Sequence, residues 1–412
     1  MFDNNLGINV LGHVTGDFGL GEAMRCTLKA IDTTSIPYDI LDLKVEGQPN
    51  LDNSYTTQPS DGDTYPINYI HTNPNWVEKI LQGYFSGVNS EIFKGKYNIG
   101  YWVWELPEFP PDWEFALDLF DEIWTPSKHA AEAISTVSPV PVVIIPHSIS
   151  CPDSSLSRKE LGLPSNKFVF LFIFDLCSSL ERKNPLAVIR AFKKAFNQYN
   201  DDVVLVLKFA GSEHFPKEKA QVVAETQGWQ NIEFIEGYLE KEEIYGLLKN
   251  CDCYVSLHRA EGFGLTMAES MFYGKPVIGT GYSSNLDFMN VGNSFLVKYN
   301  LVELKQNTPH YKKGSIWAEA DVDSAAEQMR YVFEHQQEAA SVGAKAAKDM
   351  RNLLAPAVVG KKIQRRFEYI INHKLSTLTD KLQVETAYLE AQSLAWQKTA
   401  VQVQKELNSL YS

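Results

Sequence analysis

The stretch Arg259-Ala-Glu-Gly-Phe-Gly-Leu-Thr-Met-Ala-Glu269 places two glutamates, Glu261 and Glu269, eight positions apart around a glycine-rich turn. Upstream, residues 253–257 form an apolar run typical of a buried strand. Downstream, residues 266–273 favour a short helix. A strand, a glycine turn and a helix in this order predict an open α/β unit, whose turn lies at the ligand-binding edge of its sheet.

The chemistry of this turn suits a sugar linked to a diphosphate. The free N–H groups of Phe263, Gly264 and Leu265 at the helix start favour an anion. Glu269 follows within the first helical turns, where a carboxylate can accept hydrogen bonds from both hydroxyls of a ribose. Glu261 precedes the turn and can reach a sugar bound beside the phosphates. The alternative is a surface turn with two solvated glutamates, but the Gly-Phe-Gly-Leu turn and the Gly-Lys-Pro exit together favour a binding site.

The two glutamates resemble the Glu-x7-Glu motif of retaining glycosyltransferases of the GT-B fold, in particular family 4 members of the bacterial polysaccharide biosynthesis type. The resemblance extends from Gly12 to about Arg366. It implies that Glu261 contacts the donor sugar and that Glu269 contacts the nucleotide ribose. It also implies an α/β architecture of two doubly wound, Rossmann-like domains facing a cleft, with a C-terminal helix that crosses back to the first domain.

The alternation of expected strands and helices supports two such units, although alternation alone would equally fit a dehydrogenase or a binding protein. We expect an acceptor-side domain over residues 1–150 and a nucleotide-sugar domain over 151–350, then a returning helix over 351–374 and an amphipathic helical tail over 375–412. The strands of the first domain are expected at residues 8–11, 38–43, 67–71, 97–104, 122–124 and 142–145. Those of the second are expected at residues 168–174, 203–209, 232–235, 254–257 and 277–279.

Composition narrows the class of protein. The chain has 412 residues and a net charge of −13, which argues against general affinity for nucleic acid. Its five cysteines are scattered, so neither a disulfide framework nor a zinc site is expected. The sequence has no apolar run long enough to span a membrane and no signal-peptide pattern at its start. These features indicate a cytoplasmic protein.

Breaking a glycosyl–diphosphate bond leaves negative charge on the phosphate, so fixed cations are expected nearby. Lys183 and Arg182 follow the first strand of the second domain and open its first helix. They resemble the family's phosphate-binding segment, in which many relatives place the arginine six residues before the lysine, where this chain has Cys177. Lys183 fits that segment, and Arg182 is the candidate to replace the missing arginine. Ordinary solvated charges are the alternative, but cations are unfavourable at a helix start unless an anion binds there.

The first domain contributes weaker candidates. In the family, the loop after the first strand borders the diphosphate, so Gly19, Leu20 and Gly21 are expected to line the cleft. Glu22 and Arg25 are interpreted as a surface pair.

Three further candidates follow later strands of the first domain. Family members carry a histidine that contacts the donor sugar at the position of His71. Asn73 and Glu105 are candidates for contact with the acceptor. A purely structural role is the alternative reading of His71.

Two features lie near the end of the chain. Lys361, Lys362, Arg365 and Arg366 make a basic helix face, interpreted as solvated, with peripheral contact to the inner face of the membrane as the alternative. Between residues 375 and 412 a large apolar residue recurs every seven positions, which favours packing on the chain's own surface, and hence a monomer, over dimerisation.

The resemblance implies a retaining hexosyltransferase that moves a sugar from a UDP- or GDP-sugar to an oligosaccharide or polyprenol-linked acceptor. No cofactor and no metal are expected, because no pair of aspartates stands next to a strand. The alternatives are an epimerase or phosphorylase of the same fold and a non-catalytic nucleotide-sugar binding protein.

Overall fold

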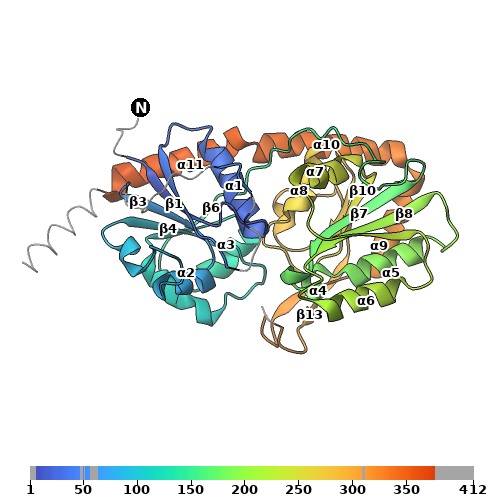
Figure 1. The fold of residues 1–412 in the computed structure, drawn as a ribbon, viewed down its shortest axis with the longest axis horizontal. Helices are drawn as coiled ribbons and strands as arrows, with labels where there is room; N and C mark the ends of the chain where they lie inside the picture. Colours follow the sequence, from blue (N-terminus) through green and yellow to red (C-terminus); the bar gives the residue numbers. More distant parts are fainter. Residues whose placement is uncertain (1–5, 47–49, 51, 56–63, 309–310, 376–412) are drawn as a thin grey trace, which may run out of the picture.

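The computed structural model describes residues 6–46, 50, 52–55, 64–308 and 311–375. The predicted tail over residues 375–412 lies outside this range except for its first residue. Two parallel sheets of six strands each form two domains side by side, each with helices on both faces (Figure 1). The fold is the two-domain α/β arrangement expected from the sequence.

The first sheet has the strand order β2-β1-β3-β4-β5-β6, and all six predicted strands are confirmed. Its strands are β1 (Ile8–Gly12), β2 (Tyr38–Asp42), β3 (Ile67–His71), β4 (Tyr97–Tyr101), β5 (Glu122–Thr125) and β6 (Val142–Ile144). The helices of this domain are α1 (Gly19–Ile31), α2 (Pro74–Leu81) and α3 (Lys128–Ser135), with short 3-10 helices η1 (Ser90–Phe93) and η2 (Pro111–Leu119). Strand β4 is shorter than predicted, because the chain leaves the sheet after Tyr101 and residues 102–105 run toward the second domain.

The second sheet has the order β12-β11-β10-β7-β8-β9. The predicted strands correspond to β7 (Phe168–Asp175), β8 (Val203–Ala210), β9 (Ile232–Glu236), β10 (Cys253–Ser256) and β11 (Val277–Thr280), and β12 (Phe295–Val297) was not predicted. The helices that follow these strands are η3 (Leu176–Ser178), α4 (Leu180–Lys183), α5 (Pro185–Ala195), α6 (Pro216–Thr226), α7 (Lys241–Asn250), α8 (Leu265–Phe272) and η4 (Ser284–Asp287).

An antiparallel hairpin, β13 (Tyr299–Glu303) and β14 (Ile316–Ala320), is a second feature that the sequence did not predict. It projects below the boundary between the domains in Figure 1. Although the hairpin follows the second sheet in the chain, its Leu304, Tyr311 and Trp317 belong to a hydrophobic cluster of the first domain that includes Trp104. The hairpin therefore ties the two domains together.

The C-terminal helices end the fold as expected. They are α9 (Val322–Glu334), α10 (Gln336–Leu354) and α11 (Pro356–Ile370), and a single π-type turn (Ile371–Leu375) follows. Helix α9 begins where the Asp321 side chain accepts hydrogen bonds from two amides of the first turn. Helix α10 packs on the second domain, whereas α11 lies along α1 of the first (Figure 1). The chain therefore crosses back to its first domain.

The sequence predicted that the basic face of α11 is solvated, and this prediction is wrong for one of the four cations on that face. Arg366 reaches the fully buried Glu122, with its Nε 3.0 and 3.1 Å from the two carboxylate oxygens. Trp124 Nε1 donates to the same carboxylate at 2.5 Å, so the charge of Glu122 is balanced inside the first domain. Lys361, Lys362 and Arg365 are exposed.

Removal of Arg366 should destabilise the protein because it would leave Glu122 charged and buried without its cation. We expect Arg366→Ala to lower the free energy of unfolding by about 3 kcal/mol, measured by urea denaturation followed by tryptophan fluorescence. Arg365→Ala, on the same helix but in solvent, is the matched control and should cost less than about 0.5 kcal/mol. Equal effects of the two substitutions would contradict the role of this ion pair.

Candidate functional site

The turn between the two glutamates has the predicted form. Helix α8 starts after Gly264, whose φ of 96° lies in the left-handed region that glycine adopts without strain. Ala268 donates the first helical hydrogen bond to the carbonyl of Gly264, so the preceding amides point out of the helix start. Phe263 is buried against His147 of the first domain, with ring centroids 4.9 Å apart. The amide-rich end of α8 therefore lies at the domain boundary.

Glu261 is only 7% exposed and sits between two cations. Its Oε1 accepts a hydrogen bond from Lys183 Nζ at 2.5 Å and lies 3.3 Å from an Arg182 guanidinium nitrogen. Burial alone would raise the pKa of Glu261, but Lys183 and Arg182 outweigh burial and hold the pKa at about 2. Three of the four side chains predicted for the catalytic site, Glu261, Lys183 and Arg182, are thus in direct contact, whereas His71 lies outside this cluster.

The loops that carry these side chains are held in strained conformations. Among the described residues, the three non-glycine residues with positive φ are Ser179 (71°), Asn184 (55°) and Ser283 (72°). Ser179 and Asn184 flank the single turn of α4 that carries Arg182 and Lys183, and Ser283 Oγ accepts the backbone N–H of Glu261 at 3.0 Å. Strain of this kind concentrates at functional sites, where the surrounding structure enforces it.

Backbone contacts join the loop after β7 to the loop after β10. Arg182 donates to the carbonyl of Ala260 at 3.1 Å, and the Arg182 carbonyl accepts the N–H of Arg259 at 2.8 Å. Arg259 in turn pairs with Glu319 of the hairpin at 2.6 Å and lies over the Trp317 ring. Sequence analysis did not identify Arg259 as part of the site, because its partners come from the unpredicted hairpin.

Glu269 lies one helical turn further along α8 and is also only 7% exposed. Burial, reinforced by the negative charge of Glu22 on α1, raises the pKa of Glu269 to about 8, while Lys29 and Lys241 oppose this shift. Since Glu22 and Lys29 both belong to α1, the Glu269 carboxyl group lies near this helix of the first domain. The two glutamates of the motif therefore occupy opposite electrostatic surroundings.

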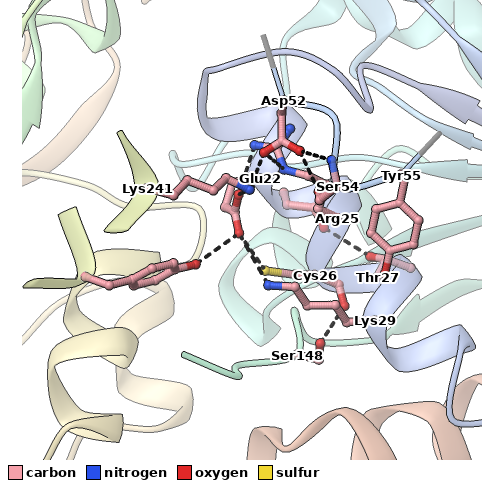
Figure 2. A network of polar contacts seen from close by, with 12 residues as sticks. Glu22, Arg25, Cys26, Thr27, Lys29, Asp52, Ser54, Tyr55, Ser148 and Lys241 are labelled. Carbon is pink, nitrogen blue, oxygen red and sulfur yellow. Dashed lines mark hydrogen bonds and ion pairs between the residues drawn. The ribbon is translucent and has the colours of Figure 1, made fainter. Parts of the chain in front are cut away.

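An ion network between α1 and α7 joins the domains (Figure 2). Lys241, the first residue of α7, pairs with Glu22 at 2.9 Å and also contacts the Asp52 carboxylate. Arg25 pairs with both of these acids, at 2.9 Å to Glu22 and 3.3 Å to Asp52. The interpretation of Glu22 and Arg25 as a surface pair is therefore wrong, because Arg25 is 2% exposed and its partners include a second acid and a lysine of the other domain.

Arg25 also fixes the glycine turn that precedes α1. Its guanidinium donates to the carbonyls of Val14 and Gly16 at 2.7 and 2.9 Å. A side chain on Gly21 would overlap the Gly16 carbonyl, so the close approach of turn and helix requires glycine there. Gly19, Leu20 and Gly21 form the first turn of α1, directly before Glu22, which places them at the domain boundary.

The segment after β4 brings Glu105 to the same cluster. A side chain on Gly262 would overlap Val103, and the Glu105 Cγ lies 3.7 Å from the position such a Cβ would take. Glu105 is among the negative charges that act on Arg182 and Lys183. Burial raises the pKa of Tyr311, and a hydrogen bond with Glu105 adds to this effect. Glu105 is thus near the predicted cations, on the side of the first domain.

Asn73 and His71 have structural contacts in this conformation. The Asn73 amide donates to the Val103 carbonyl at 3.0 Å and accepts the Val103 N–H at 2.8 Å, which fixes the segment that leads to Glu105. His71 is fully buried and stacked on Tyr101 at 4.4 Å, and neither ring nitrogen has a hydrogen-bond partner among the described residues. Burial lowers the pKa of His71 well below its ordinary value, so the ring is neutral.

The arrangement of the two sheets and their helices is that of known proteins. The chain has the GT-B glycosyltransferase fold. Residues 153–349 match the family model described as glycosyl transferases group 1. That match covers the whole segment from Lys183 through Glu261 to Glu269.

Similar solved structures share this fold at low sequence identity. Anabaena HepE in complex with UDP and glucose has a TM-score of 0.59 and 16% identity over 88% of this chain and 99% of its own. A glycosyltransferase from Rickettsia africae has a TM-score of 0.63 and 13% identity over 90% and 100%. Sucrose-phosphate synthase from Thermosynechococcus elongatus has a TM-score of 0.63 and 14% identity over 89% and 99%.

Two other kinds of feature are not found among the described residues. No group of three or more His, Cys, Asp or Glu side chains among them is placed to hold a metal ion. No helix in the described part of the chain is both long and apolar enough to cross a membrane.

The raised pKa of Glu269 predicts a pH-dependent stability. Because this pKa of about 8 in the folded protein exceeds the ordinary value of 4.5, the folded state holds the proton more tightly. The free energy of unfolding should therefore fall as pH rises between these two values. Glu269→Gln, which stays neutral, should remove this contribution, so that the wild type loses stability relative to the variant from about pH 5 to about pH 8.5 in urea denaturation. Parallel curves for the two proteins would contradict the burial of Glu269.

Proposed function

We propose that this protein is a retaining, metal-independent hexosyltransferase. It transfers a sugar from a nucleotide sugar to an oligosaccharide or polyprenol-linked acceptor in polysaccharide biosynthesis. The observation that carries the proposal is the cluster of Lys183, Arg182 and Glu261 beside the N-terminus of α8. The family match over residues 153–349 supports the class of reaction.

The cluster suits the departure of a nucleoside diphosphate. The amides at the start of α8 and the two cations would face the diphosphate, while Glu261 would accept hydrogen bonds from hydroxyls of the donor sugar. Glu261 pairs with both cations in this structure, and an arriving phosphate would replace part of this pairing. Charges that are already fixed in a buried site do not have to reorient as the leaving diphosphate gains negative charge. This lowers the activation barrier for breaking the sugar–phosphate bond.

The transfer step needs no protein nucleophile. The bond between the sugar C1 and the diphosphate oxygen breaks, and its electron pair stays on that oxygen. The acceptor hydroxyl oxygen bonds to C1 on the same face, and its proton passes to the departing diphosphate. Glu105, which stands on the first-domain side of the cluster, is the group of this chain proposed to orient the acceptor hydroxyl.

The donor is proposed to be a UDP-sugar, with a GDP-sugar as the alternative. HepE, one of the similar structures, was solved with UDP-glucose. Glu269 would accept hydrogen bonds from the ribose hydroxyls once it loses its proton, and Gly19 to Gly21 would border the diphosphate from the first domain. The protein is further proposed to act as a cytoplasmic monomer, with peripheral contact to the membrane where the acceptor is lipid-linked.

A direct test is incubation with UDP- and GDP-sugars and an oligosaccharide or polyprenol-phosphate acceptor. Proton NMR of the product should show the anomeric configuration of the donor, and excess EDTA should leave the rate unchanged because protein cations replace a metal. An inverted product would contradict the mechanism. Turnover that requires only inorganic phosphate and a saccharide would instead indicate a phosphorylase, and nucleotide-sugar binding without any turnover would indicate a sensor.

Lys183 should act mainly on the leaving group. With donor saturated, Lys183→Ala is expected to lower kcat about 100- to 1,000-fold, while the Kd for the donor rises much less, because its charge matters most as the phosphate departs. Steady-state kinetics and calorimetric titration separate the two quantities. Lys345→Ala, an exposed cation on α10 of the same domain, serves as the control. A kcat within a few-fold of the wild type would contradict this role of Lys183 and would make Arg182 the next candidate for stabilising the leaving phosphate.

A further inference from the structure

Helix α7 begins with a cation, which is an unfavourable residue for a helix start. Lys241 is its first residue, and the Glu243 carboxylate accepts the backbone N–H of Glu240 at 2.9 Å, as in an ordinary helix cap. Because the N-terminus of a helix carries partial positive charge, a lysine there is destabilising unless anions lie nearby. The anions that lie near Lys241 belong to the other domain.

The partners of Lys241 are two acids of the first domain that are largely shielded from solvent. Lys241 Nζ lies 2.9 Å from Glu22 and also contacts Asp52, and the side chains of these acids are only 18% and 4% exposed. Arg25 pairs with both acids, and Lys29 lies farther from Glu22, at 3.8 Å. Two shielded carboxylates beside one buried guanidinium favour a second close cation, and the second domain supplies it.

A second group on α7 reaches the same acid. Tyr245 is 6% exposed, and its hydroxyl donates to Glu22 at 3.5 Å. Residues four positions apart lie on the same face of a helix, so Lys241 and Tyr245 direct one face of α7 at the first domain. Figure 2 shows Lys241 extending from α7 to the acids of the first domain.

The network continues into the glycine turn that precedes α1. The Arg25 guanidinium donates to two carbonyls of this turn, and the backbone N–H of Asp52 donates to a third, that of Thr15, at 3.2 Å. Glu22 belongs to the first turn of α1, directly after the glycines. The groups that Lys241 contacts therefore fix the part of the first domain that borders the proposed diphosphate position.

Another ion pair crosses the same boundary at the hairpin. Lys312 lies 2.8 Å from Asp112, but these two side chains are 63% and 71% exposed. An ion pair in solvent contributes little to stability, because water weakens the attraction and two long side chains must be ordered. Of these two cross-domain contacts, the one made by Lys241 has the shielded partners and is expected to have the larger effect on how the domains are oriented.

We propose that Lys241 is a positioning residue that holds the first domain, through Glu22 and Asp52, in the orientation that completes the donor site. The consequence for donor binding rests on the proposed function, whereas the consequence for domain orientation does not. Without this cation the two domains separate more often. The apparent Kd of a ligand bound between them then rises by the factor by which the competent arrangement is depleted.

The test combines small-angle X-ray scattering of the ligand-free full chain with calorimetric titration of UDP and GDP. Lys241→Met, which keeps the length and removes the charge, should enlarge the radius of gyration and raise the Kd of the tighter-binding nucleotide about 3- to 10-fold. Saturating nucleotide should return the radius of gyration of this variant to the wild-type value. Lys241→Arg keeps the charge and should leave the radius unchanged and the Kd within twofold of the wild type.

Lys312→Met is the matched control, because it removes the cation of an exposed pair across the same boundary, and it should leave both quantities unchanged. Thermal denaturation of each variant confirms that it is folded. A Lys241→Met protein with the wild-type radius of gyration would overturn the positioning role, and a raised Kd in that case would make Lys241 a direct nucleotide contact. Equal changes in Lys312→Met would also overturn it. A wild type that binds neither nucleotide would contradict the donor function, while the scattering comparison would still decide the role of Lys241.

Discussion

The ion pair between Glu261 and Lys183, shared with Arg182, is the contact on which the architecture of the site depends. It joins the loop after β10 to the turn after β7, two segments with little regular structure of their own. Because Glu261 is buried and the Lys183 side chain is only 20% exposed, the pairing is weakly screened by salt, and its loss would leave uncompensated charge inside the protein. The strained backbone at Ser179, Asn184 and Ser283 persists because these contacts enforce it.

Around this cluster, the two domains meet through groups of different kinds. Apolar contact dominates where Phe263 meets His147 and where Tyr311 of the hairpin enters the aromatic cluster of the first domain. Charge dominates where Lys241 reaches Glu22 and Asp52 (Figure 2). Glu269 lies beside the charged part of the boundary, and Glu261 lies beside the apolar part. The two glutamates of one motif therefore have different neighbours from the first domain. A ligand between the domains would therefore alter both.

The sequence predicted the regular parts of this fold well, because short continuous apolar runs bounded by turn residues favour buried parallel strands. It also placed Glu261, Lys183 and Arg182 at one cleft, since loops that follow the carboxyl ends of neighbouring parallel strands meet at the same edge of the sheet. It missed β12, which has only three residues, and the hairpin, whose loop lacks periodicity. It also misjudged Arg25 and Arg366, because the acids that neutralise them, Asp52 and Glu122, are distant in the chain.

The return of α11 to the first domain affects how the protein can fold during translation. Val359, Ile363, Phe367 and Ile370 complete a core that otherwise consists of residues from the first 145 positions of the chain. A ribosome delivers the first domain early, yet these four side chains emerge only after the whole second sheet has been made. During synthesis, the apolar surface of the first domain that α11 covers therefore stays exposed until the second domain has been translated. The first domain is translated first, but its core cannot be completed before the C-terminal helix emerges.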